Sequence, residues 1–413
     1  MHGPRPTRTA AMLFAGKSAE VSTPRLVATM GALWFAGVAM RMTILAMPPV
    51  IPLVHAELHM SETQVGLLVG LPLLMFALAA IPGSLLIARL GVMLAVIAGM
   101  VIAALAGAAR GAAPDVPMLY GASIAAGFGV AIMQPGLPTL ARSWAPSRIG
   151  LATVAYTSGM MMGATFPPLL TNAYILPLVG DSWRLYFVLW AVPALLIVPI
   201  FWLLSPRQDS PGGPQATNHR LWWPDFKNPV VWLLGLTFGS NNSPYFAINA
   251  FLGDYVAQQG RPDLLGPSLA WLNGSQLAAL VVLLALSGRL QRRIWPFVLF
   301  GPMLLAGFLA IILVPAGSLV VAAATLIGIA TAMTFTPIMT LPPILSTPAD
   351  LPRTAAGMLT IAYGCAIIVP TVCGALWDLT GRPWAAFVPL CVCAAALTVL
   401  GTLVARHRAP GEA

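Results

Sequence analysis

Long apolar runs dominate this chain, and about twelve of them follow one another between Leu26 and His407. A run of about 18 or more apolar residues is long enough to cross a bilayer as a helix. Only 8% of the residues are charged and 58% are hydrophobic, which excludes a water-soluble globular protein of 413 residues. The sequence therefore predicts an all-α integral membrane protein with twelve transmembrane helices, near residues 26–53, 64–87, 92–110, 117–141, 149–179, 183–204, 229–257, 264–287, 295–315, 318–345, 354–377 and 383–404.

One long polar interval divides the chain into two halves. Residues 205–228 are rich in Pro, Gly and charged side chains, and half of the apolar runs precede them. We expect a cytoplasmic tail over residues 1–25, a six-helix bundle over 26–204 and a cytoplasmic linker over 205–228. A second six-helix bundle is expected over 229–404, followed by a cytoplasmic tail over 405–413.

The basic residues predict the orientation in the membrane. If the N-terminus is cytoplasmic, 16 of the 21 Lys and Arg fall on the inner side, and Arg41 lies inside a span. The outer side then holds four, namely Arg110, Arg184, Arg261 and Arg382. Because cytoplasmic loops carry an excess of Lys and Arg, both termini are expected in the cytoplasm, with the protein in the cell inner membrane. Topology also explains the net charge of +9, so no nucleic-acid partner is expected.

The two halves resemble one another at matching places. Thr153-Val154-Ala155-Tyr156 in the fifth span corresponds to Thr360-Ile361-Ala362-Tyr363 in the eleventh. Gln134-Pro135 in the fourth span corresponds to Thr336-Pro337 in the tenth. Matches in register over several spans predict duplicated, pseudo-symmetric bundles, with a binding site where the halves meet near the middle of the membrane.

Arg41 is the one formal charge deep inside any apolar run. A charged side chain at the bilayer centre costs about 2.5–3.5 kcal/mol on insertion scales. A guanidinium offers a planar pair of donors to carboxylates and other oxyanions, and it cannot lose its charge. We interpret Arg41 as a contact for a small anionic substrate. The alternative is that it hydrogen bonds to helix carbonyls freed near Pro48.

Polar side chains at helical spacing complete the candidate site. Asn242, Tyr245 and Asn249 form one stripe on the seventh span, with Asn241 at its edge. By span order this stripe is placed to face Arg41. Other expected cavity residues are Gln134, Tyr156 and Tyr363, with Asn273, Gln276 and Thr336 as additional candidates. The alternative for all of them is helix–helix hydrogen bonding without a ligand.

Other classes of site find little support in the sequence. The five His lie outside the span cores, and Cys391 and Cys393 are about 200° apart on a helix, so neither a catalytic set nor a metal site is expected. No cofactor is expected either, and the protein is expected to be a monomer. Asp254 and Asp378 lie near outer span ends and are expected to be solvated. With no titratable group expected near the middle of the membrane, we expect a transporter that is not coupled to protons. It would work by anion exchange or facilitated flux.

The first half resembles a known transporter family. The residues that carry the resemblance are Arg41 before a Pro-rich span end at residues 47–52, Gly70-Leu71-Pro72, and Trp183-Arg184. Arg110 and the segment 127–138, which begins Gly127-Phe128-Gly129, complete the set. With these residues the chain resembles the major facilitator superfamily, and within it the cyanate permease and nitroimidazole permease branch, over roughly residues 30–205.

The resemblance implies a substrate class, although the sequence differs from the family pattern at two positions. It implies alternating access and a cyanate-like, inorganic or small organic oxyanion, or alternatively a small heteroaromatic or amphiphilic compound that is nitroimidazole-like. The superfamily's acidic residue in the loop after the second span is Ala88 here, which puts a gate built on that acid in doubt. The Arg that many proton-driven members carry in the fourth span is Ser123.

Overall fold

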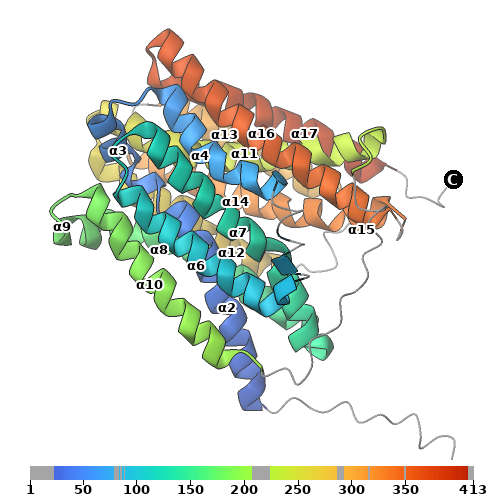
Figure 1. Ribbon diagram of the computed structural model, residues 1–413. Coiled ribbons are helices and arrows are strands. Elements are labelled where there is room, and N and C mark those ends of the chain that lie inside the picture. The colour runs from blue at the N-terminus through green and yellow to red at the C-terminus, as the bar shows by residue number, and fades with distance from the viewer. Residues whose placement is uncertain are drawn as a thin grey trace, which may run out of the picture.

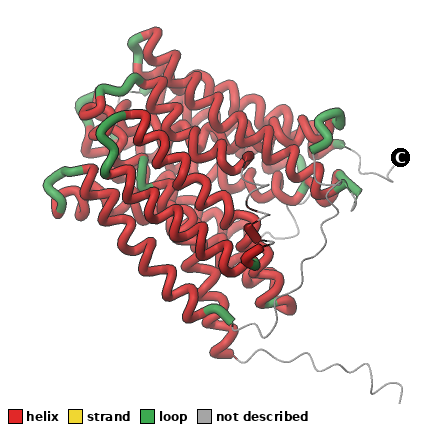
Figure 2. The backbone as a smooth tube through the Cα atoms, in the orientation of Figure 1, coloured by secondary structure: helices red, strands yellow, loops and turns green. Residues whose placement is uncertain are grey.

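The computed structural model describes residues 23–78, 83, 86–87, 89–206, 224–285, 293–314, 317–347 and 350–407. The predicted tail up to residue 22, most of the predicted linker and the last six residues lie outside these ranges. All regular structure within them is helical (Figures 1 and 2).

Six long helices belong to the first half of the chain: α2 (Thr23–Leu45), α4 (Glu62–Leu78), α6 (Val92–Gly111), α7 (Val116–Trp144), α8 (Ile149–Leu170) and α10 (Trp183–Leu204). Six belong to the second half: α11 (Pro229–Gln258), α12 (Leu265–Ala285), α13 (Trp295–Leu313), α14 (Ser318–Thr340), α16 (Leu351–Thr380) and α17 (Val388–Arg406). Among the described residues, 8 helical segments meet length and composition criteria for crossing a membrane. The other four are α4, which is shorter, and the more polar α8, α11 and α12, each of which packs against the opposite half.

The packing of the helices repeats between the halves. In the first half α2 packs on α8, α6 on α7, α6 on α10 and α4 on α7. The second half repeats these contacts as α11 on α16, α13 on α14, α13 on α17 and α12 on α14. The two main contacts between halves, α4 with α16 and α8 with α12, are also exchanged by the same symmetry. The predicted fold of two pseudo-symmetric six-helix bundles is confirmed.

Prolines interrupt three of the predicted spans. The first span ends at Leu45 and continues after a turn as the 3₁₀ segment η1 (Pro48–Val50) and α3 (Ile51–Leu58). The fifth passes through a π turn (Thr171–Ile175) into α9 (Leu176–Leu178), and the tenth is followed by α15 (Pro342–Leu345). Proline lacks an N–H and clashes with the preceding turn, so the helix path changes where prolines cluster.

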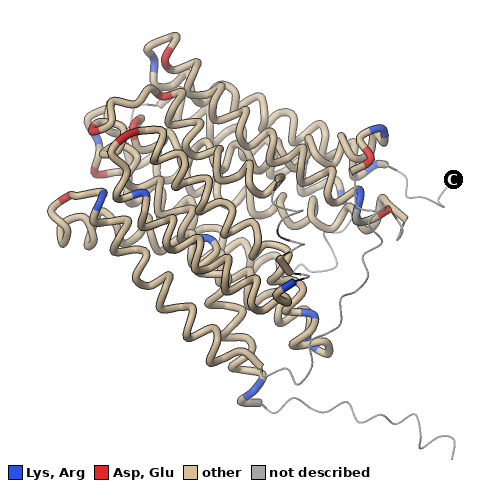
Figure 3. The backbone as a smooth tube through the Cα atoms, viewed as in Figure 1, with Lys and Arg blue, Asp and Glu red and all other residues tan. Residues whose placement is uncertain are grey.

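The two halves meet most closely at the end of the bundle where α3 lies. There Gly66 of α4 faces the backbone of Pro370, and Gly374 of α16 faces the backbone of Glu62, so closely that a Cβ would collide. Toward the opposite end, where α2 begins and α15 lies, the halves diverge (Figure 1). Charged residues gather at the two ends, and acidic residues are concentrated at the α3 end (Figure 3). This end corresponds to the predicted outer side.

Candidate functional site

Arg41 lies on α2 where the two halves face each other. Its guanidinium carbon is 5.8 Å from the ring centroid of Phe246 on α11. Within the described part of the chain, no acceptor hydrogen bonds to Arg41 and no carboxylate forms an ion pair with it. Its donors are therefore available to a ligand.

Arg110 corrects one prediction from the sequence. It was placed on the outer side at the end of the third span, yet only 1% of it is exposed inside the first bundle. Its Nη1 donates to the Thr43 carbonyl at 2.8 Å and its Nε donates to the Ser123 hydroxyl at 3.1 Å. It also lies over the ring of Phe187. Arg41 is thus not the one charge among the helices, and the protein itself binds the guanidinium of Arg110.

The polar stripe of α11 is joined to α12. The Tyr245 hydroxyl donates to Asn273 Oδ1 at 2.6 Å, and Asn273 Nδ2 donates to Asn249 Oδ1 at 3.1 Å. Asn249 Nδ2 in turn donates to the Tyr245 carbonyl at 2.8 Å. Asn242 behaves differently, because its buried Nδ2 has no partner. The stripe thus contains a closed network and one free amide.

A separate polar contact joins the two halves near Arg41. Gln134 Nε2 of α7 donates to the Tyr363 hydroxyl of α16 at 2.8 Å. Aromatic rings surround this tyrosine, with Phe76 at 5.0 Å and Phe238 at 6.2 Å between centroids. Phe335 packs on Phe238 in turn. The surroundings of Arg41 therefore combine amide and phenol groups with a wall of aromatic rings.

The remaining candidates have different surroundings. Tyr156 is half-buried, and its backbone packs against Gly37, one turn before Arg41. Gln276 has a buried Nε2 without a partner, and Thr336 is half-buried. Asn241 instead connects α11 to α14, because it donates to the Thr331 carbonyl at 3.3 Å and accepts from the Thr334 hydroxyl at 2.8 Å. Asn241 therefore holds helices together within the second half.

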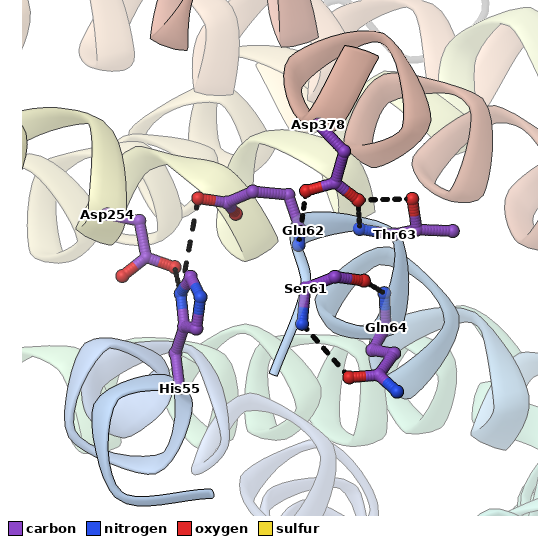
Figure 4. A network of polar contacts seen from close by, with 7 residues as sticks. All are labelled: His55, Ser61, Glu62, Thr63, Gln64, Asp254 and Asp378. Atoms are coloured by element: carbon purple, nitrogen blue, oxygen red, sulfur yellow. Dashed lines mark hydrogen bonds and ion pairs between the residues drawn. The ribbon is translucent and has the colours of Figure 1, made fainter. Parts of the chain in front are cut away.

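A cluster of titratable side chains at the α3 end was not predicted (Figure 4). His55 Nδ1 is 2.9 Å from Asp254 Oδ2 and 4.0 Å from Glu62 Oε1. Asp254 was expected to be solvated, but it is 6% exposed because α3 and α4 cover this end of α11. The Asp378 side chain is exposed, yet it accepts from the backbone N–H groups of Glu62 and Thr63 at 2.9 and 2.8 Å. Residues about 200 to 300 positions apart form this cluster, so local sequence patterns carry no signal for it.

A groove also opens at the α3 end, away from Arg41. It has a volume of about 770 Å³ and runs between the first-half residues Pro49 and Pro168 and the second-half residues Gly253 and Trp271. Its lining is mostly apolar and includes none of the predicted site residues. An apolar groove without convergent polar groups does not orient a small anion.

Comparisons with known proteins identify the family. The Major Facilitator Superfamily model matches residues 33–370. The chain is 25% identical to the cyanate transport protein CynX of Escherichia coli (strain K12) over 287 residues, which cover 68% of this chain and 71% of that protein. It is 27% identical to the 2-nitroimidazole transporter of the same organism over 251 residues, 59% of this chain and 61% of that protein.

Another relative is the uncharacterized transporter YycB of Bacillus subtilis (strain 168), which is 26% identical over 226 residues. The match spans 54% of each of the two chains, about half the length of that relative.

Solved structures share the fold at low sequence identity. A bacterial homolog of the human lysosomal transporter Spinster, in an inward-facing and occupied conformation, superposes with a TM-score of 0.68 at 16% identity. That match covers 93% of this chain and 96% of the other. A variant of the nucleoside transporter NupG superposes with a TM-score of 0.71 at 13% identity, covering 92% of this chain and 99% of the other. With its family model, its transporter relatives and its two packed six-helix halves, the chain belongs to the Major Facilitator Superfamily.

Proposed function

We propose that this chain is a carrier that moves a small anion across the cell inner membrane by alternating access. The observation that supports the proposal most strongly is Arg41, a fixed positive charge between the two halves with no hydrogen-bond acceptor among the described residues. A charge in such a place is costly unless something pairs with it. A substrate anion supplies that partner when it binds.

The chemistry of the surrounding groups fits a small oxyanion. The guanidinium supplies two parallel donors, which match a carboxylate or a cyanate-like or inorganic oxyanion. The amide of Asn242 adds a buried donor without a partner, and Gln276 adds another. Tyr363 and Gln134 belong to opposite halves and are joined by a hydrogen bond. A substrate that contacts either residue would therefore affect the contact between the two bundles.

A second candidate is a small heteroaromatic compound, which the aromatic wall favours. Phe246 lies beside Arg41, and Phe76, Phe238 and Phe335 follow around Tyr363. A guanidinium stacks on flat rings as well as binding anions. The similarity to the 2-nitroimidazole transporter supports the same reading. In this case Arg41 would contribute stacking rather than charge pairing.

The proposed orientation and assembly follow from the sequence. We place both termini in the cytoplasm and the α3 end on the outer face, because of the distribution of Lys and Arg. The halves then meet on the outer side and diverge on the inner side, as expected of an inward-facing carrier. The protein would function as a monomer, because the proposed substrate site lies between the two halves of a single chain. Family membership favours transport over catalysis.

The test is uptake into proteoliposomes that contain purified protein. Arg41→Ala should reduce uptake of labelled cyanate, or of whichever small anion a thermal-shift screen selects, by about ten- to hundred-fold. The estimate corresponds to a charged hydrogen bond of about 1.5–3 kcal/mol. Arg41→Lys should fail nearly as badly, because an ammonium lacks the paired donors.

Two controls give this experiment its meaning. Arg382→Ala removes an exposed arginine and should transport normally. Uptake of a neutral nitroimidazole by the Arg41 variants distinguishes the two candidate substrates. If Arg41 binds an anion, the variants should lose uptake of the anion and keep uptake of the neutral compound. Anion uptake by Arg41→Ala at the wild-type rate would refute the anion site.

A further inference from the structure

The cluster at the α3 end brings together three potential metal ligands from three helices. His55 comes from α3, Glu62 begins α4 and Asp254 lies near the end of α11 (Figure 4). One nitrogen or oxygen atom of each lies within 4.8 Å of the others. His55 and Glu62 belong to the first half of the chain and Asp254 to the second, so the cluster bridges the halves.

The hydrogen bonds of the cluster leave one carboxylate oxygen unsatisfied. His55 Nδ1 has a single hydrogen to give and lies at hydrogen-bond distance from Asp254. Glu62 is 5% exposed, and its Oε2 is buried without a partner. Asp378 adds a third carboxylate beside Glu62. Among the described residues no Lys or Arg forms an ion pair with Glu62 or Asp254, so two buried carboxylates share one imidazole. Burial raises the pKa of the Glu62 carboxyl to about 8, so at neutral pH a proton neutralises it, and a bound cation would replace that proton.

We propose that His55, Glu62 and Asp254 form a binding site for a divalent transition metal of the Zn²⁺ class. Zinc bonds to histidine nitrogen and carboxylate oxygen are about 2.0–2.2 Å long, so neighbouring ligand atoms in a tetrahedron are about 3.4 Å apart. The observed separations of 2.9 and 4.0 Å lie on either side of that value. Small side-chain rotations bring all three atoms onto one ion. Water supplies the fourth ligand, and the protons on His55 Nδ1 and on the Glu62 carboxyl are released to solvent on binding.

The ligand set selects the metal. Calcium takes about six to eight oxygen ligands, whereas this site offers two carboxylates and one imidazole. Imidazole with carboxylate is a set that zinc and related ions accept. The cation also balances the two carboxylates, which a metal of single charge would not.

Contacts around the cluster hold the ligands in place. Ser61 and Gln64 bond reciprocally at the start of α4, since Gln64 N–H donates to Ser61 Oγ and Ser61 N–H donates to Gln64 Oε1. This capping box fixes the helix start from which Glu62 projects. Asp378 of α16 accepts from the next two backbone N–H groups and so positions Glu62 from the opposite half. Such supporting contacts are what metal ligands require.

Metal binding would hold the outer end of the carrier closed. Opening that end requires α11 to separate from α3 and α4, and an ion bound to all three helices opposes the separation. The imidazole side chain is 23% exposed, so an ion can reach the site from the outer face. The binding step is independent of the proposed anion substrate, whereas its effect on transport depends on the proposed alternating access.

Zinc titration of the purified full-length protein, without substrate, tests the binding step. Isothermal titration calorimetry with ZnCl₂ should show one site per chain in the wild type. His55→Ala and Glu62→Gln should each weaken it by about tenfold or more. Glu62→Gln conserves shape, so it remains informative if His55→Ala does not fold. His59→Asn is the matched control, because His59 is an exposed histidine one turn away in a left-handed conformation that Asn also adopts, and it should bind zinc normally.

Hydrogen exchange tests the closing of the outer end. Zinc should slow backbone exchange around residues 55–64 and also around 250–258, because one ion holds segments of both halves. The protection should be absent in His55→Ala and Glu62→Gln. Equal zinc affinity in wild type and Glu62→Gln, no zinc binding by the wild type, or protection confined to one half would overturn the proposal. Failure of anion uptake would leave these binding results unchanged.

Discussion

Two arginines within the helices of the first half, Arg110 buried and Arg41 half-buried, have opposite surroundings. Arg110 donates to the Thr43 carbonyl and the Ser123 hydroxyl, so the protein satisfies it. Arg41 faces the ring of Phe246 and has no acceptor among the described residues. Both guanidiniums carry the same charge, and the difference lies in the groups that the fold places around them. A satisfied cation stabilises the bundle, whereas an unsatisfied one can bind a substrate.

We predict that Arg110 is structural. Arg110→Met should lower the thermal stability of the purified protein, because it leaves the Thr43 carbonyl without its donor at a cost of about 1–3 kcal/mol. Ser123→Ala removes one acceptor and should have a smaller effect. The melting temperature in detergent measures both, with the exposed Arg382→Met as control. An Arg110→Met protein as stable as the wild type would show that the buried guanidinium contributes nothing to folding.

At the scale of single helices, α11 has a polar face with two kinds of residue. Tyr245 and Asn249 are bonded to Asn273 of α12, and Asn241 is bonded to α14. Asn242 carries a buried amide nitrogen without a hydrogen-bond partner. Pro244 lies between these residues, where it removes a backbone N–H and loosens the helix at the site. The same helix therefore holds the second bundle together and supplies a candidate ligand contact.

The two kinds of asparagine should respond differently to substitution. Asn273→Leu should lower the melting temperature, because each interhelical hydrogen bond between polar side chains contributes about 0.6 kcal/mol and this residue makes two. Asn242→Leu removes an unpaired buried amide and should leave stability unchanged or raise it, while weakening uptake. If Asn242→Leu instead destabilises the protein as much as Asn273→Leu, then Asn242 serves packing and not substrate.

At the scale of the whole molecule, the duplicated packing gives the two halves equivalent contacts with each other. The contacts between halves, α4 with α16 and α8 with α12, are equivalent under the internal symmetry. Each half can therefore rock against the other without unfolding its own bundle. In this structure the close approach at Gly66 and Gly374 and the contact between His55 and Asp254 keep the α3 end together.

We predict that the α3 end faces outward. A reporter fused after Ala413 and one inserted near Pro211 should both read cytoplasmic, because 16 of 21 Lys and Arg fall on that side. Alkaline phosphatase and green fluorescent protein fusions measure the two outcomes. Phosphatase activity at either position would reverse the orientation and place the metal-ligand cluster inside the cell.

Periodicity and composition were enough to predict the helices and their division into two bundles, because each apolar run must form a helix in a bilayer. The residue matches between the halves predicted the pseudo-symmetry, because equivalent residues occur in equivalent helices of the two bundles. The breaks after Leu45 and Leu170 were less visible, because proline is common inside membrane helices and its effect depends on the neighbouring helix.

The sequence by itself determined which residues are costly to bury, and Arg41 and the polar stripe on α11 were found on that basis. Only the tertiary structure decided which of these residues have partners. Arg110 lies close to a helix end in the sequence, yet Thr43 and Ser123 from two other helices enclose it. His55, Glu62 and Asp254 are unremarkable singly and meet because α3, α4 and α11 converge at one end. The burial of a group and its partners depend on contacts between distant segments, and no local pattern encodes them.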